Sequence, residues 1–429
     1  MPAESFPKRL IIAQRQMEQL RLLLDQLLPG NKFYAAKFDA AGVYKKVPSL
    51  AHYFEQFPFT TKQELVDDQL AHPPYGTNLT YPLERYTRCH QTSGTTSTPL
   101  RWLDTPESWN WMLGNWEQIF GVAGVKRGDR ICFAFSFGPF IGFWLAFEAA
   151  VRLGCLCLPT GGASSAARLR LILDHGITVL CCTPTYAIHL GEVAAKEQID
   201  LSASPVKLII VAGEQGGSIP ATRAAIEGFW PGARVFDHHG MTEVGPVSYE
   251  CPAQPGVLHV MESAYIAEVL ETSSRRPMAA GMTGELVLTT LGRVGSPLLR
   301  YRTGDLVTTS PDTVCLCGRS ELALIGGILS RADDMVIVRG VNTYPSAVEE
   351  IIRRCGGIAE YQAEVTTAGS MNELTIQIEP DPACADALGL ARKLEEALAA
   401  SLALRVPVMV AAAGTLPRYE LKARRWLKK

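Results

Sequence analysis

Short apolar runs alternate with amphipathic segments through the middle of this 429-residue sequence. The apolar runs are 131–137, 155–159, 178–182, 208–211 and 234–237, and the segments between them predict helices over 140–153, 166–175, 185–196 and 219–229. Continuous apolar strands that alternate with helices indicate a parallel sheet buried on both faces. Ligands bind beyond the carboxyl ends of such strands, so the segments 211–214 and 237–243 lie where chemistry is expected.

The apolar run 131–147 is long enough to need a test against a membrane span. It contains no charged residue, but Gly138, Pro139 and Gly142 interrupt it and Glu148 follows at once. A spanning helix needs about 20 apolar residues with few helix breakers. We therefore expect a strand, a turn and a buried helix here, and no membrane partner.

The rest of the chain divides into flanking helices, a β-rich region and a compact C-terminal unit. Helices are predicted over 9–28 and 106–120, residues 60–64 resemble a helix cap, and 81–90 predicts a strand. Alternation and glycine-rich turns over 256–309 predict strands at 265–270, 284–289, 298–301 and 306–309, in an antiparallel sheet or a small barrel. The C-terminal unit has the order strand (335–338), helix (346–355), strands (361–367 and 374–379), helix (387–402) and strand (408–411).

These patterns predict two domains. Residues 1–330 form a large α/β domain of parallel sheets flanked by helices, with a β-rich subdomain at about 250–320. Residues 331–429 form a small α+β domain.

Composition excludes some functions. Forty-one basic and 43 acidic side chains leave a net charge of −2, which argues against nucleic-acid binding. The eleven cysteines follow no disulfide-framework spacing, and the N-terminal segment shows no secretory signal, so we expect reduced thiols in a cytoplasmic protein.

A run of hydroxyl side chains stands out before the tryptophan-rich helix. Six Ser and Thr residues and Gly94 lie between Thr92 and Thr98, and Pro99 ends the run. Hydroxyl groups compete with the backbone for hydrogen bonds, which disfavours a helix. Gly94 lets the backbone approach a ligand closely, so the run suits a phosphate cradle, although a solvated loop is the alternative.

Six segments together resemble the adenylate-forming superfamily, in particular its phenylacetate-CoA ligase branch, and they appear in that family's order. They are the hydroxyl-rich loop 92–99, the pocket segment 211–214, the motif 239–243 with its Thr-Glu pair, the ribose motif 301–305, the hinge signature 331–345 and the lysine segment 416–423. The resemblance covers nearly the whole chain. It implies an ATP- and Mg²⁺-dependent ligase that converts an acid to an acyl-AMP, with release of pyrophosphate, and then to a CoA thioester.

The resemblance also implies roles for individual residues. Thr92, Ser93, Gly94, Thr95 and Thr96 would hold the leaving phosphates, Thr242 the α-phosphate, Glu243 Mg²⁺, Asp305 and Arg331 the ribose, and catalytic Lys422 the carboxylate and α-phosphate. Gly213, Glu214, His238, His239, Gly240 and Met241 would surround the adenylate, with His239 stacking on adenine. These roles suit the reaction, because positioning and charge neutralisation supply most of the catalysis in phosphoryl chemistry.

The second half-reaction would need a movement of the small domain. Asp333 matches the family's hinge aspartate, and Gly340 would let the pantetheine arm of CoA pass. The phosphate loop departs from the family at Ser97, Thr98 and Leu100, where Leu100 replaces a frequent basic residue and Arg101 is a candidate to compensate.

Cys251, His259, Cys315 and Cys317 form a possible structural zinc set. Three thiolates and one imidazole complete a tetrahedral zinc shell, although the C-x-C spacing is shorter than usual. Similar placements in the phenylacetate-CoA ligase branch support zinc. Ordinary buried cysteines and a hydrogen-bonded histidine are the alternative.

The acid pocket is expected to be flat and apolar. Its predicted lining is Phe135, Ser136, Phe140, Ile141, Gly213 and Met241. Such a pocket suits an aryl acid, and phenylacetate, benzoate and anthranilate all remain open. A carrier-protein thiol as acceptor and a non-catalytic nucleotide-binding protein are alternative functions, and the resemblance suggests a homodimer.

Overall fold

The computed structural model describes the chain apart from residues 1–5, 29, 45, 93–98, 333–335, 340, 369–370, 403, 420–424 and 429. Its middle part is a five-stranded parallel sheet with the order β4-β3-β5-β6-β7. The strands are β3 (Arg130–Phe133), β4 (Leu156–Pro159), β5 (Val179–Cys182), β6 (Leu208–Val211) and β7 (Arg234–Asp237). The predicted parallel sheet is confirmed.

Helices cover both faces of this sheet, because alternate strand residues point to opposite sides. In β3, Ile131 and Phe133 enter the core beneath the helices at 106–123 and 144–153. Cys132 enters the core on the opposite face, beneath the helices at 165–174, 184–196 and 220–229. The helices are α5 (Pro106–Ala123), α6 (Trp144–Leu153), α7 (Ser165–Asp174), α8 (Pro184–Lys196) and α9 (Pro220–Phe229).

Two predicted boundaries were wrong around the apolar run at 131–147. The first strand ends at Phe133 and α6 begins at Trp144, so 134–143 is irregular. Gly142 has φ +38°, and a Cβ there would lie 2.2 Å from the Phe135 ring, which explains the break. Among the described residues no helix is long and apolar enough to cross a membrane.

The predicted strand at 81–90 is also shorter than expected. A short 3₁₀ turn at Leu83–Arg85 precedes β1 (Arg88–Gln91), which pairs with β2 (Arg101–Asp104) in an antiparallel hairpin. The hydroxyl-rich loop connects these two strands, and its residues Ser93–Thr98 lie outside the described residues.

The β-rich region is an open six-stranded antiparallel sheet with the order β10-β11-β15-β14-β13-β12. Its strands are β10 (Ser248–Cys251), β11 (Gln254–Val260), β12 (Tyr265–Leu270), β13 (Thr283–Thr290), β14 (Tyr301–Thr309) and β15 (Ala323–Arg331). The predicted strand at 298–301 was wrong, because β14 begins at Tyr301 and continues through the predicted strand at 306–309. The sequence reading missed β15.

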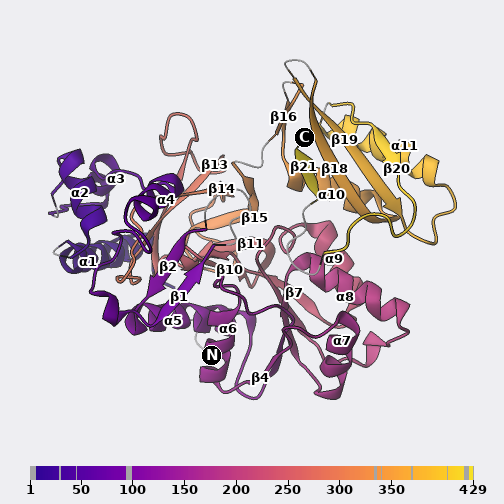
Figure 1. The fold of residues 1–429 in the computed structure, drawn as a ribbon, viewed down its shortest axis with the longest axis horizontal. Coiled ribbons are helices and arrows are strands. Elements are labelled where there is room, and N and C mark those ends of the chain that lie inside the picture. The colour runs from indigo at the N-terminus through magenta and orange to yellow at the C-terminus, as the bar shows by residue number, and fades with distance from the viewer. Residues whose placement is uncertain are drawn as a thin grey trace.

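Four N-terminal helices pack at the edge of this sheet (Figure 1). They are α1 (Arg9–Leu27), α2 (Lys32–Ala41), α3 (Leu50–Gln56) and α4 (Lys62–Ala71). The first three of these helices share a core in which Leu24, Tyr34 and Tyr53 join Ile266 and Leu299 of the sheet region, whereas α4 packs in the central core. A buried aromatic core fixes the N-terminal segment on the β-rich region.

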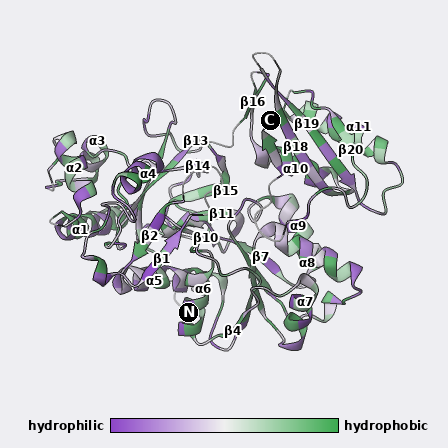
Figure 2. Ribbon diagram, in the orientation of Figure 1, coloured by the Kyte–Doolittle hydropathy of each residue, from purple (hydrophilic) through white to green (hydrophobic). Residues whose placement is uncertain are grey.

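The C-terminal residues form a separate sheet with its own core, beside α8 and α9 (Figure 1). The elements are β16 (Val336–Val338), β17 (Val341–Thr343), α10 (Pro345–Cys355), β18 (Ile358–Ala368), β19 (Met371–Pro380), α11 (Ala387–Leu402), β20 (Val408–Val410) and β21 (Trp426–Lys428). Hydrophobic and hydrophilic residues alternate along β18 and β19 (Figure 2), as expected for a sheet with one covered face. The sequence reading missed the short strands β17 and β21.

Candidate active site

The carboxyl ends of the parallel strands bring the expected pocket segments together. Glu214 follows β6, and its Oε1 accepts a hydrogen bond from the backbone N–H of Thr185, 2.8 Å away at the start of α8. His238 follows β7 directly, and the next residues form the short strand pair β8 (Gly240–Met241) and β9 (Gly245–Pro246). The site therefore lies at the strand ends, as the topology requires.

His238 is buried against Trp116 of α5, with ring centroids 4.5 Å apart. Its Nδ1 lies 2.8 Å from the carbonyl oxygen of Ser248. A carbonyl oxygen only accepts, so Nδ1 carries the proton and Nε2 is an acceptor. Burial lowers the pKa of His238 to about 4, which keeps the ring neutral near pH 7.

Aromatic rings form the apolar part of the expected acid pocket. The Phe135 ring packs edge-to-face on Phe140 at 5.3 Å and on Phe143 at 5.4 Å. Ile141 is buried and Met241 packs against the same core, whereas Ser136 is exposed in the irregular segment. The sequence reading missed Phe143 and Trp116, because both lie in segments that it read only as packing helices.

The expected ribose residues lie together. Asp305 on β14 pairs in register with Arg331 on β15, and Arg331 Nη1 lies 3.1 Å from Asp305 Oδ1. His239 Nε2 lies 3.0 Å from the other oxygen of the same carboxylate. Gly304 has φ +75°, and a Cβ there would lie 3.0 Å from Arg331, so a larger residue would disturb this contact.

Thr242 and Glu243 connect β8 to β9, and both are largely buried. Arg293 Nη1 donates to their backbone carbonyl oxygens, at 2.7 Å from Thr242 and 2.8 Å from Glu243. Arg293 also binds both carboxylate oxygens of Asp104 on β2, through Nε at 2.7 Å and Nη2 at 2.6 Å. Sequence reasoning missed this fully buried pair, because no local pattern marks either residue.

The base of the hydroxyl-rich loop is closed by two hydrogen bonds. The backbone N–H of Thr92 donates to Leu100 O at 2.9 Å, and the Leu100 N–H donates to Thr92 Oγ1 at 3.1 Å. Ser93, Gly94, Thr95 and Thr96 lie outside the described residues. The Leu100 side chain is buried in the core, and Arg101 Nη1 donates to Pro74 O at 2.8 Å.

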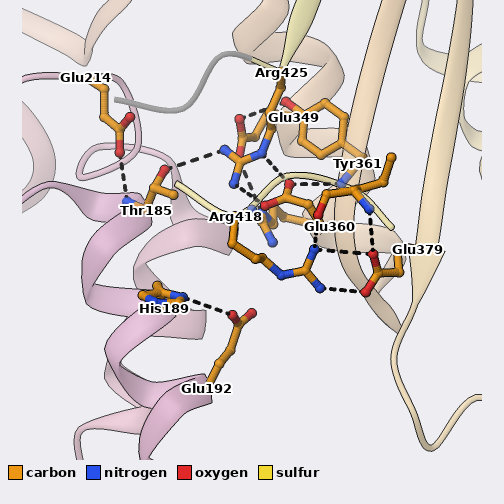
Figure 3. Close-up of polar contacts among 12 residues, drawn as sticks. Thr185, His189, Glu192, Glu214, Glu349, Glu360, Tyr361, Glu379, Arg418 and Arg425 are labelled. Carbon is orange, nitrogen blue, oxygen red and sulfur yellow. Dashed lines mark hydrogen bonds and ion pairs between the residues drawn. The ribbon is translucent and has the colours of Figure 1, made fainter. Parts of the chain in front are cut away.

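Lys422, Asp333 and Gly340 also lie outside the described residues, but the residues flanking Lys422 are described. Arg418 Nη2 binds Glu379 Oε1 at 2.6 Å, and Arg425 Nε binds Glu360 Oε1 at 2.5 Å (Figure 3). Arg425 Nη1 also lies 3.5 Å from Thr185 Oγ1, next to the backbone N–H that binds Glu214. The ends of the lysine segment are thus anchored to the small domain and placed beside α8.

The four expected zinc ligands lie together. The ligand atoms of Cys251, His259, Cys315 and Cys317 all lie within 4.8 Å of one another. Cys251 Sγ is 3.5 Å from Cys315 Sγ, which is too long for a disulfide bond, and Cys317 Sγ is 3.4 Å from His259 Nε2. Three sulfurs and one nitrogen around one point fit the donor chemistry of a closed tetrahedral zinc site.

Family models match two parts of the chain. Residues 90–292 match the AMP-binding enzyme family, and residues 340–429 match the AMP-binding enzyme C-terminal domain. The phenylacetate-coenzyme A ligase of Escherichia coli (strain K12) is 30% identical over 420 residues, which cover 95% of this chain and 92% of that protein. The phenylacetate-coenzyme A ligase of Aromatoleum evansii is 32% identical over 378 residues, which cover 86% and 81%.

Solved structures of 2-hydroxyisobutyryl-CoA ligase are similar over the whole chain. In its postadenylation state with 2-HIB-AMP, that protein matches with a TM-score of 0.94 at 27% identity, covering 100% of this chain and 92% of that one. In its thioesterification state with 2-HIB-AMP and CoA, the TM-score is 0.74 at 28% identity, with coverages of 99% and 91%. The domain arrangement described here is therefore similar to the postadenylation one.

Proposed function

Because this chain belongs to the phenylacetate-CoA ligase family of AMP-binding enzymes, we propose that it is an ATP-dependent aryl-acid CoA ligase. The acid and ATP give an aryl-AMP and pyrophosphate, and CoA then gives the aryl-CoA and AMP. The expected adenylate-forming fold and the acid–thiol ligase class are confirmed by the same relatives.

One observation carries the proposal. His239 and Arg331 both contact the carboxylate of Asp305. Arg293 binds the backbone of Thr242 and Glu243, which follow His239 closely in the chain. Vicinal ribose hydroxyls require a carboxylate acceptor, and phosphates require hydroxyl donors and positive charge. We assign Asp305 and Arg331 to the ribose, Thr242 to the α-phosphate, and Gly240, Met241, Gly213 and Glu214 to the walls around the adenylate.

Lys422 is proposed to neutralise the charge that builds up between the carboxylate and the α-phosphate. The flanking residue Arg425 supports this role, because its Nη1 lies 3.5 Å from Oγ1 of Thr185, whose backbone N–H binds Glu214. We also propose that the loop residues hold the leaving phosphates; these residues are Ser93, Gly94, Thr95 and Thr96.

Mg²⁺ fits the donor set at Glu243. The Glu243 carboxylate and the Thr242 hydroxyl are hard oxygen ligands, which Mg²⁺ prefers. When bound, the metal would neutralise phosphate charge. Glu243 is nearly buried, and the cation that pairs with it in this structure is Lys62, whose Nζ lies 3.4 Å from Glu243 Oε1.

The proposed substrate is a flat aryl or arylacetic acid. Phe135, Phe140, Ile141 and Met241 supply apolar walls, and rings that pack edge-to-face offer a natural partner for another ring. The neutral His238 acceptor would favour a substrate that carries a hydrogen-bond donor, such as an amino or hydroxyl group.

The test is a pyrophosphate-release screen over phenylacetate, benzoate, anthranilate and 2-hydroxyisobutyrate, with and without CoA. We expect release with an aryl acid, and aryl-CoA when CoA is added. Release only with 2-hydroxyisobutyrate would contradict the aryl assignment. If a carrier-protein thiol outcompetes CoA, the carrier protein is the acyl acceptor. No pyrophosphate release with any acid would support a non-catalytic nucleotide-binding protein.

We propose a two-domain organisation, with residues 1–330 as the large domain and residues 331–429 as the small one. Asp333 would act as the hinge, since it falls between β15 and β16 in the chain, and Gly340, between β16 and β17, would border the CoA path. All eleven cysteines are free, which suits the proposed cytoplasmic location. From the family resemblance we also propose that the protein forms a homodimer.

We further propose that Cys251, His259, Cys315 and Cys317 hold structural zinc. The four ligand atoms would fill a tetrahedral shell and leave no open position, so the metal would stabilise the fold rather than take part in the reaction.

A further inference from the structure

Lys62, the first residue of α4, reaches the candidate site from outside the segment that matches the AMP-binding enzyme model. Its Nζ lies 3.4 Å from Glu243 Oε1. The Lys62 side chain is 42% exposed, whereas the Glu243 side chain is only 8% exposed. A half-exposed lysine side chain thus pairs with a carboxylate that is nearly buried.

The position of Lys62 is fixed by the fold on its N-terminal side. The backbone of Thr60 bonds to both neighbours of Tyr301, with its N–H donating to Arg300 O at 3.0 Å and its oxygen accepting from Arg302 N–H at 2.9 Å. Tyr301 begins β14, the strand that carries Asp305. A capping box between Thr61 and Glu64 then starts α4 at Lys62.

The other end of α4 is attached to the hairpin that holds the phosphate loop. Gln69 Nε2 donates to Arg101 O at 2.7 Å, and the Arg101 N–H donates to Gln69 Oε1 at 3.0 Å. Leu65 and Val66 share a core with Leu100 and Trp102. The helix therefore bridges the ribose strand β14 and the phosphate-loop strand β2, with Lys62 at the end nearer the ribose strand.

This position matters because neither residue at the C-terminal end of the loop directs a cation toward it: position 100 is a leucine and Arg101 donates elsewhere. Leu100 is 1% exposed and belongs to the core, and the guanidinium group of Arg101 donates to Pro74. Pyrophosphate is a highly charged leaving group, and its departure requires positive charge close to its oxygens.

We propose that Lys62 is a catalytic residue of the adenylation half-reaction, binding the β- and γ-phosphates of ATP and stabilising the departing pyrophosphate. The proposal rests on the proposed function above. An oxygen of the acid attacks the α-phosphorus, the bond from the α-phosphorus to the bridging oxygen breaks, and pyrophosphate takes the electron pair. Lys62 transfers no proton, because its charge compensates the negative charge on the leaving oxygen. In this structure the same ammonium pairs with Glu243.

The experiment compares Lys62→Met and Lys62→Arg with the wild type in two half-reactions. One is pyrophosphate release with the acid and ATP, and the other is thioester formation from supplied aryl-AMP and CoA. Loss of one charge-assisted contact predicts a roughly ten- to hundredfold slower pyrophosphate release in Lys62→Met. Thioester formation should change less than about threefold, because no pyrophosphate leaves in that step. Lys62→Arg should recover part of the loss.

Nucleotide binding gives an independent readout. By calorimetry, Lys62→Met should weaken ATP binding about tenfold but leave AMP binding unchanged, since AMP lacks the β- and γ-phosphates. Lys46→Met, which removes an exposed lysine of the same N-terminal region, should match the wild type in every assay. Melting curves of all variants establish that they are folded.

Three results separate the outcomes. Unchanged pyrophosphate release and ATP affinity in Lys62→Met would overturn the proposal and leave Lys62 as a surface ion-pair partner. Equal loss in both half-reactions, or equal weakening of ATP and AMP, would also overturn it in favour of a structural role. A wild type that releases no pyrophosphate but binds ATP more tightly than Lys62→Met would overturn the proposed ligase function and the catalytic role alike, leaving Lys62 as a phosphate-binding residue.

Discussion

Arg293 connects three parts of the chain through one guanidinium group. It binds Asp104 on the strand after the phosphate loop and the backbone of Thr242 and Glu243, and both charged side chains are fully buried. A buried ion pair adds stability only when its geometry is good and its remaining donors are satisfied. Here four hydrogen bonds meet that condition, so we infer that Arg293 is a positioning residue for the Thr-Glu pair.

Arg293→Lys should slow pyrophosphate release by about tenfold or more and raise the Mg²⁺ concentration needed for half-maximal rate, because lysine cannot hold Asp104 and two carbonyl oxygens together. Half-reaction rates over a Mg²⁺ series check this. Arg300→Lys is the matched control, since Arg300 forms a similar buried pair with Glu268. If Arg293→Lys lowers only the melting temperature, like the control, the residue is merely structural.

Sequence reasoning singled out Asp305 and Arg331, which lie together in the structure, and it missed Arg293 and Asp104 for a physical reason. Asp305 belongs to the contiguous ribose motif, and Arg331, its neighbour in the sheet register, begins the hinge signature. Arg293 and Asp104 are 189 residues apart, and each is an ordinary charged residue in its local segment. Only the packed structure, in which neither can reach water, distinguishes them.

Among the elements, the cysteine and histidine cluster brings together two parts of the β-rich region. One is the edge of the sheet formed by β10 and β11, and the other is the turn before β15. Cys251 ends β10, His259 lies in β11, and Cys315 and Cys317 occupy the turn. The parallel strands were predictable because a sheet covered on both faces gives continuous apolar runs. By contrast, β15 was missed because glycines and polar residues break its alternation.

The purified protein should contain about one equivalent of zinc, and Cys315→Ala should lose it and melt at least about 5 °C lower. Metal analysis and melting curves measure both effects. Cys384→Ala removes a free cysteine of the small domain and should change neither. Less than about half an equivalent of zinc in the wild type would rule out the metal and leave the cluster as buried thiols beside a histidine.

At the scale of the whole molecule, the small domain meets the large one at α8 and α9. Glu192 of α8 lines a crevice together with Arg353 and Arg418 of the small domain. Figure 3 shows Glu192 and Arg418 at this contact. Burial raises the pKa of Glu192, and the charge of Arg418 opposes this shift. The sequence could not predict this contact, because it depends on how two separately folded units dock.

Reversing the charge at this crevice should separate the two half-reactions. Glu192→Arg would place three cations together and disfavour the present arrangement by roughly 1 kcal/mol or more at an effective dielectric constant of about 20. Since this arrangement is similar to the postadenylation structure, pyrophosphate release should fall about tenfold. Thioester formation from supplied aryl-AMP should be unchanged or faster, because the other arrangement becomes easier to reach. Glu197→Arg, the same change just beyond the end of α8 and outside the crevice, is the control. Equal slowing of both steps by Glu192→Arg would show that the crevice stabilises the fold without selecting a domain arrangement.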